Sequence, residues 1–178
     1  MSSAHARLRS WIAEPELGLC HRLNRWGARS SVRQFFCTIS RLGDGPVWYA
    51  LMIALALLGG RNGALAAVHL AIVGLCCLLL YRSLKRWTRR PRPFATHASI
   101  HALIEPLDEF SFPSGHTLHA TAFTIVACAY VPVLAWVLLP FALLIALSRV
   151  VLGMHYPSDV LAALLIGGII GIGSLLAL

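Results

Sequence analysis

Two histidines and one aspartate in the second half of the chain have the types and spacing of a nucleophile, its partner and a proton donor. Asp159 follows His155 by four residues, a spacing that places the carboxylate near the imidazole, where it fixes the tautomer and stabilises the imidazolium. His116 follows Ser114, a residue that suits the start of a helix. His155 and His116 can therefore act as nucleophile and proton donor.

Basic groups elsewhere in the chain suit a phosphate. Lys85, Arg92 and Arg149 supply three cations, and arginine can bind phosphate oxygens in a bidentate manner. The helix that opens after Ser114 presents free N–H groups to an anion, and Gly115 lets a ligand approach the backbone closely. The sequence has no cluster of carboxylates that suggests bound Mg²⁺. These groups predict metal-independent phosphoryl transfer through a phosphohistidine, with no metal and no cofactor.

The elements that must position these groups are strongly apolar. Of the 178 residues, 58% are hydrophobic and 12% are charged, yet the net charge is +8. This composition excludes a disordered, collagen-like or disulfide-stapled chain and disfavours a water-soluble globule. Three of the five cysteines lie inside long apolar runs, where we interpret them as small hydrophobes.

Runs without charged residues predict the membrane spans. They cover 46–60, 64–81, 113–148 and 160–178, and the third is long enough for two helices with a break at Pro132. We expect residues 59–63 to form a turn. The predicted fold is all-α, a multi-pass transmembrane helical bundle of about five spans, in one domain over 1–178.

Residues 1–45 have a different pattern. Arginines alternate with apolar residues that recur at steps of three and four, which predicts amphipathic helices lying in the membrane interface. Residues 46–178 would then form the catalytic bundle. A nucleic-acid-binding arm is the alternative, which the membrane runs that follow disfavour. The arginines of this segment are Arg7, Arg9, Arg22, Arg25, Arg29, Arg33 and Arg41.

Strict alternation of the spans brings the polar segments to one face of the membrane. Helices that end near 82 and 150, and helices that begin near 114 and 157, share that face. The basic loop before Pro113, the His116 region and the segment 149–159 therefore converge.

Several other polar or aromatic residues have simpler interpretations. We expect four basic residues beside the loop to contact water or lipid headgroups, and two aromatic residues to anchor the chain at the interface. We expect three acidic residues to lie on the loop surface, with control of substrate entry as the alternative. In the order basic, acidic and aromatic, these residues are Arg82, Arg86, Arg89 and Arg90; Glu105, Asp108 and Glu109; and Trp48 and Tyr49.

Three motifs together resemble the signature of the type 2 phosphatidic acid phosphatases, a superfamily that includes the vanadium haloperoxidases. They are Lys85-x6-Arg92-Pro93, Pro113-Ser114-Gly115-His116 and Ser148-Arg149-x5-His155-x3-Asp159. The resemblance implies that His155 attacks phosphorus, Asp159 orients it and His116 protonates the leaving oxygen. It also implies that the phosphate oxygens are held by Lys85, Arg92, Ser114, Gly115 and Arg149. Fuller members have six helices; short bacterial members, including undecaprenyl diphosphate phosphatases, look more like this chain.

The resemblance implies an integral-membrane lipid phosphate phosphatase of the bacterial inner membrane. Its substrate would be a phosphomonoester or diphosphate of a membrane lipid, such as phosphatidate, phosphatidylglycerol phosphate or undecaprenyl diphosphate. We expect the lipid substrate and the bilayer as partners, and no nucleic acid. The alternative is a non-catalytic lipid-binding or transport protein that retains the fold; a haloperoxidase is a more distant third.

The positive-inside rule would place the active face in the cytoplasm. However, at least three of the cations counted would serve to bind phosphate. Bacterial members of the family usually act at the extracytoplasmic face, and we favour that side.

Overall fold

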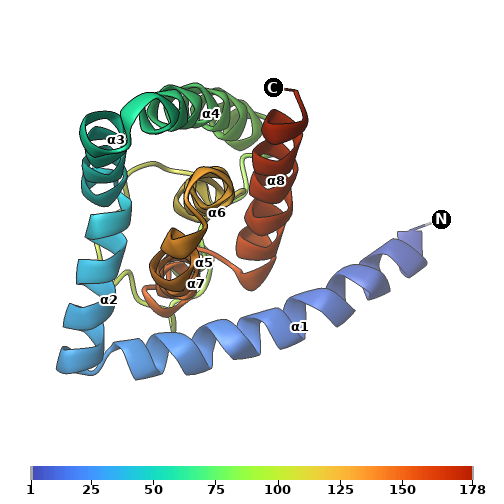
Figure 1. The fold of residues 1–178 in the computed structure, drawn as a ribbon. Coiled ribbons are helices and arrows are strands. Elements are labelled where there is room, and N and C mark those ends of the chain that lie inside the picture. The colour runs from blue at the N-terminus through green and yellow to red at the C-terminus, as the bar shows by residue number, and fades with distance from the viewer. Residues whose placement is uncertain (1, 178) are drawn as a thin grey trace.

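The computed structural model describes residues 2–177, with the side chains of residues 15–177 (Figure 1). Within that range the chain forms helices and no strands, which confirms the predicted all-α fold. In chain order the helices are α1 (Ser2–Gly27), α2 (Ser30–Gly43), α3 (Pro46–Leu58), α4 (Gly60–Thr88), α5 (Pro93–Thr96), α6 (Gly115–Tyr130), the 3₁₀ helix η1 (Pro132–Leu134), α7 (Ala135–Val151) and α8 (Pro157–Leu176).

The multi-pass bundle is confirmed, with fewer full-length spans than the five expected. Three segments are long and apolar enough to cross a membrane, and α2 with α3 forms a pair, bent by 45°, that is either a broken fourth span or a re-entrant segment. The three are Gly60–Thr96, Pro132–Val151 and Pro157–Leu176. The remaining apolar helix, α6, has 16 residues and a length of about 24 Å, which is short of the ~30 Å hydrocarbon core.

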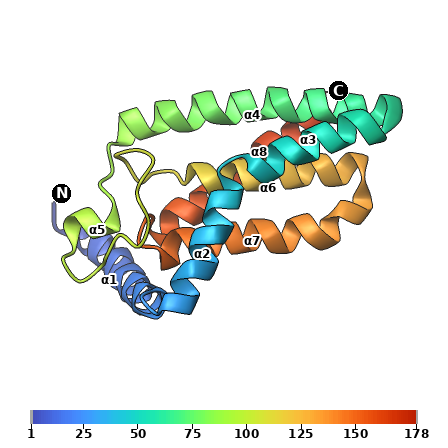
Figure 2. The ribbon, with the colours of Figure 1, turned by 90° about the vertical axis from the view of Figure 1, so that its left-hand side faces the viewer.

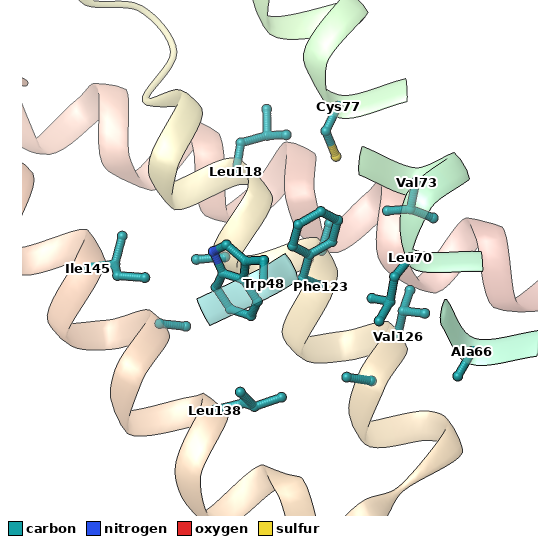
Figure 3. Packing of buried hydrophobic residues seen from close by; sticks show 14 of the residues in the cluster. Trp48, Ala66, Leu70, Val73, Cys77, Leu118, Phe123, Val126, Leu138 and Ile145 are labelled. Atoms are coloured by element: carbon teal, nitrogen blue, oxygen red, sulfur yellow. The ribbon is translucent and has the colours of Figure 1, made fainter. Parts of the chain in front are cut away.

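Helix α6 lies inside the bundle. It contacts α4, α7 and α8, and in Figure 1 the pair α6 and α7 lies within a frame formed by the other long helices. Close packing of α6 on α8 depends on Gly167, because a Cβ there would lie 2.6 Å from the backbone oxygen of Leu118. Figure 3 shows the core beside it, where Phe123 of α6 meets Trp48 and Leu70.

Trp48 differs from the expected interface anchor. Its side chain is 3% exposed, and its ring lies 5.3 Å from that of Phe123. Tyr49, the next residue, is 63% exposed, as an anchor at the interface should be. The difference follows from helix periodicity, because neighbouring residues on α3 point about 100° apart and Trp48 falls on the face toward α6.

Helix α4 extends further than the apolar run predicted. It ends at Thr88 instead of near 82, and therefore carries Lys85 on a helix and not in a loop. Basic residues are good helix formers and are favourable in the last turns, where they interact with the helix dipole. Arg89, the residue after the helix, has a left-handed backbone conformation with φ of 48°, which ends the helix there.

The N-terminal helices pack against the bundle. Helix α1 contacts α7 and α8, and α2 contacts α7. Buried Asn24 of α1 donates hydrogen bonds to the carbonyl oxygens of His101 and Val151, at 2.9 and 3.2 Å. The interfacial position of this segment stays a prediction. Five of its arginines are exposed, whereas the side chains of Arg7 and Arg9 lie outside the described residues.

Candidate active site

The helix ends that the sequence predicts to share a face do so. Figure 2 shows the C-terminal ends of α4 and α7 and the N-terminal ends of α6 and α8 at the same end of the bundle. A cavity of about 870 Å³ lies there. Six of the eight predicted site residues line it: Lys85, Arg92, Gly115, His116, Arg149 and His155.

His155 and Asp159 form the expected pair. His155 lies in the short loop between α7 and α8, and Asp159 lies in the first turn of α8, with side chains 1% and 0% exposed. The distance from His155 Nδ1 to Asp159 Oδ2 is 3.6 Å. Asp159 Oδ2 also accepts a hydrogen bond of 2.9 Å from the backbone N–H of Tyr156, which completes a capping box at the start of α8.

The contact of His155 with Arg92 assigns the tautomer. His155 Nε2 lies 3.4 Å from Arg92 Nη1. A guanidinium has only donors, so Nε2 accepts this hydrogen bond and the ring proton is on Nδ1, beside Asp159. The lone pair of Nε2 is therefore on the side of the cation that should bind phosphate, as attack on phosphorus requires.

The surroundings keep His155 uncharged. Burial lowers the pKa of His155 well below its ordinary value, and the positive charges of Arg149, Arg92 and Lys85 lower it further. The imidazole is consequently neutral at pH 7, which is the form that can act as a nucleophile.

A carboxylate of the loop is bound to two of the cations that the sequence predicts to bind phosphate. Lys85 Nζ donates to both oxygens of Asp108, at 2.6 and 2.7 Å, and Arg92 Nη2 donates to Oδ1 at 2.7 Å. Burial raises the pKa of Asp108, but hydrogen bonds and charges from Lys85 and Arg92 outweigh it, so the net shift is downward. Asp108 thus lies on the loop surface as expected, with 38% of its side chain exposed, but its carboxylate is paired with two cations of the cavity.

The end of α2 contributes two side chains that motif spacing does not predict. Arg149 Nη1 donates to Ser40 Oγ, and His116 Nε2 contacts Asp44 Oδ1. Ser40 is buried on α2, and Asp44 follows in the bend before α3. The only sign in the sequence is their spacing of four residues, which puts them on one face of an amphipathic segment.

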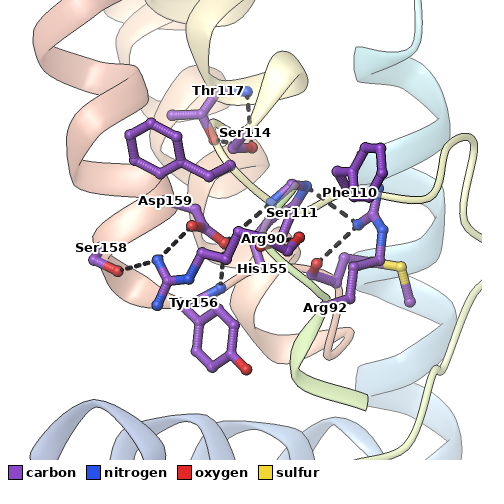
Figure 4. A network of polar contacts seen from close by, with 12 residues as sticks. Arg90, Arg92, Phe110, Ser111, Ser114, Thr117, His155, Tyr156, Ser158 and Asp159 are labelled. Carbon is purple, nitrogen blue, oxygen red and sulfur yellow. Dashed lines mark hydrogen bonds and ion pairs between the residues drawn. The ribbon is translucent and has the colours of Figure 1, made fainter. Parts of the chain in front are cut away.

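Ser114 and Gly115, at the start of α6, differ in their position relative to the cavity. Ser114 is the N-cap of α6, fully buried, and its Oγ lies 3.0 Å from Thr117 Oγ1 (Figure 4). Its hydroxyl does not line the cavity, whereas Gly115 does. The direct role of Ser114 in phosphate binding stays a prediction; the cap it forms places the amides of the first turn at the cavity.

Arg90 also differs from its expected position at the lipid or solvent surface. Its guanidinium pairs with Asp159 at 2.7 Å, as Figure 4 shows. Among the side chains that the structure describes, those of residues 15–177, no group of three His, Cys, Asp or Glu residues could hold a metal ion. That observation leaves the metal-independent chemistry a prediction.

Comparison with known proteins defines the class to which this bundle and site belong. Residues 45–178 match the model of the PAP2 superfamily, so the chain belongs to that family and the resemblance read from its three motifs is confirmed. The crystal structure of Aquifex aeolicus LpxE superposes with a TM-score of 0.77 at 31% identity, over 89% of this chain and 93% of that one.

Two curated relatives are phosphatases by name, in agreement with the predicted enzyme class. Undecaprenyl-diphosphatase BcrC of Bacillus subtilis is 36% identical over 126 residues, which cover 70% of this chain and 65% of that protein. Decaprenylphosphoryl-5-phosphoribose phosphatase of Mycobacterium tuberculosis is 36% identical over 138 residues, 75% of this chain and 73% of that protein. The chain thus spans slightly less than two thirds of the first relative's length.

Proposed function

We propose that this membrane protein hydrolyses a phosphomonoester or diphosphate of a membrane lipid in the cavity at the end of the bundle. One observation carries the proposal: the cavity joins a cationic end to an apolar wall. Lys85, Arg92 and Arg149 line the cationic end with His155, and the apolar wall includes Met52 of α3 and Leu70, Leu75 and Leu78 of α4. A lipid phosphate has the matching two-part chemistry.

The geometry supports a two-step phosphoryl transfer. His155 Nε2 attacks phosphorus, the bond to the leaving oxygen breaks, and Asp159 stabilises the imidazolium that forms. His116 gives its proton to the leaving oxygen and then takes one from the water that releases phosphate from His155. The three cations and the Gly115 amide hold the charge on the phosphate oxygens, and each such donor contributes about 3 kcal/mol.

Our candidate substrates are phosphatidate, phosphatidylglycerol phosphate and undecaprenyl diphosphate. The names of the two curated relatives, which specify undecaprenyl and decaprenyl lipids, support a polyprenyl substrate. We place the protein in the bacterial inner membrane with its active face outside the cytoplasm.

The test is phosphate release by purified protein from each candidate lipid in the presence of EDTA, with and without vanadate. We expect release from at least one lipid, inhibition by vanadate and no turnover after His155→Ala. His101→Ala is the matched control, because the exposed His101 bonds through its backbone and not its ring.

Loss of all activity in EDTA would overturn the metal-independent mechanism. Absence of release from every lipid would favour the alternative, a lipid-binding or transport protein that retains the fold. In that case His155→Ala would leave the cellular function intact.

A further inference from the structure

Arg90 connects the catalytic carboxylate to the N-terminal helix. Arg90 Nη1 lies 2.7 Å from Asp159 Oδ1 and 2.7 Å from Ser158 Oγ, while Nη2 lies 3.2 Å from Glu16 Oε2 of α1. The guanidinium also stacks over the ring of Tyr156, 4.1 Å from its centroid. Four partners from α1, α8 and the residue before α8 thus hold one side chain, and Figure 4 shows the contacts made around Asp159.

The two oxygens of Asp159 are held from different sides. Oδ1 accepts from Arg90, whereas Oδ2 accepts from the Tyr156 N–H and faces His155 Nδ1 at 3.6 Å. Rotation of the carboxylate would break a charge-assisted hydrogen bond to Arg90. Arg90 therefore fixes which oxygen faces His155.

Glu16 holds Arg90 in turn. One carboxylate oxygen of Glu16 pairs with Arg90, and the other accepts a 2.8 Å hydrogen bond from the backbone N–H of Ser158, in the first turn of α8. An acidic group at a helix N-terminus is stabilised by the free N–H groups there. The side chain of Glu16 is only 10% exposed, so this contact belongs to the packed interior.

A surface role does not account for Arg90. Its side chain is 31% exposed and bonded to two carboxylates, and it does not line the cavity, whereas its neighbour Arg89 is exposed. Asp159 is fully buried beside a neutral imidazole, so Arg90 is the cation that balances its charge. Removal of one partner from such a pair leaves an uncompensated charge.

We propose that Arg90 is a positioning residue for the Asp159–His155 pair, and that Glu16 of α1 holds it in place, so the N-terminal helix completes the active site. The inference rests on the proposed phosphatase activity. Arg90 acts through Asp159 and does not touch the lipid phosphate.

A change in the pH profile distinguishes positioning from simple folding. The charged and titratable groups that face His155 are Asp159 of α8, Arg149 of α7, Lys85 of α4, His116 of α6 and Arg92. When Arg90 is replaced by the neutral glutamine, no positive charge offsets the negative charge of Asp159 on the side away from His155. The imidazolium of His155 is then more stable, its pKa rises, and the acid limb of activity moves to higher pH.

The experiment compares full-length Arg90→Gln, Arg90→Lys and Glu16→Gln with wild type, on the lipid of the three-member panel that wild type turns over fastest. We expect Arg90→Gln to lower kcat about tenfold or more, to leave KM within about twofold, and to raise the acid limb by about half a pH unit or more. Arg90→Lys should restore the acid limb and part of kcat. Glu16→Gln should lower kcat less than Arg90→Gln does. The double variant should have nearly the same kcat as Arg90→Gln alone, because both changes act through the same contact.

Arg89→Gln is the matched control and should behave as wild type. Unchanged kcat in Arg90→Gln, an equal loss in Arg89→Gln, or a raised KM at constant kcat would overturn the inference while the phosphatase activity stands. An inactive wild type would overturn both proposals. If Arg90→Gln does not fold, Arg90→Lys and Glu16→Gln decide: wild-type kcat and pH profile in both would overturn the inference.

Discussion

At the residue scale, the balance of charge in the cavity determines how a phosphate enters. Lys85 and Arg92, the cations expected to bind it, already hold the carboxylate of Asp108 with bonds of 2.6 to 2.7 Å. An arriving phosphate carries the same sign of charge and must take over these donors. Asp108 therefore competes with the substrate, and its removal should favour anion binding.

The variant Asp108→Asn tests this competition. We expect vanadate to inhibit it about tenfold more tightly than wild type, because one charge-assisted contact of about 1.5 kcal/mol no longer opposes the anion. The measurement is the inhibition constant of vanadate at pH 7. Glu105→Gln removes the same charge from an exposed position outside the cavity and should change little. Weaker inhibition in Asp108→Asn would instead mean that Asp108 orients the two cations for phosphate.

The same residues mark where sequence reasoning succeeds and where it ends. Motif spacing predicted the His155–Asp159 pair and the cations around it, because both the pair and Lys85 with Arg92 are local in sequence. Arg90 and Asp44 were missed, since their partners lie 69 and 72 residues away and no local pattern encodes such a contact.

At the element scale, close packing of α6 on α8 brings His116 and Asp159 to one site. Apolar runs and the Pro132 break predicted these helices, and η1 begins at that proline. They did not predict the length of α4, because its last turns are charged and resemble a loop in sequence. Nor did they predict that the end of α2 reaches the cavity, which depends on the bend before α3.

Gly167→Ala tests the α6–α8 contact. Its Cβ would lie 2.6 Å from the backbone oxygen of Leu118, so the helices must separate, and we expect a loss of about 1–3 kcal/mol in stability together with reduced turnover. Gly168→Ala is the matched control, because nothing lies within 4 Å of a Cβ there. The midpoint of thermal unfolding in detergent and the phosphatase rate measure the two effects. Equal midpoints in the two variants would contradict the packing argument.

At the scale of the whole molecule, one end carries the chemistry and the other consists of short connections. The loop at 97–112 lies at the active end, and the connection between α3 and α4, with Arg61 and Asn62 in the first turn of α4, lies at the other. The distribution of charged residues along the sequence predicted this asymmetry, since most of them lie in the N-terminal segment and around one loop.

Labelling with a membrane-impermeant thiol reagent tests which end faces outward. In a variant without the native cysteines, Ala98→Cys at the active end should react in intact cells, whereas Asn62→Cys should react only after lysis. Both positions are exposed in the structure, so their accessibility differs only through the membrane. The reverse pattern would place the active face in the cytoplasm and refute the orientation that we propose.

The wall of the cavity between α3 and α4 has a kinetic consequence. Tyr49 and Leu75 line the cavity and are also 63% and 56% exposed, so this wall is open to the surroundings of the bundle. A substrate that arrives by this side diffuses in two dimensions and keeps its tails in the leaflet throughout. The encounter rate is then governed by the mole fraction of substrate among the surrounding lipids, and dilution with inert lipid slows the reaction even when the total amount of substrate is unchanged.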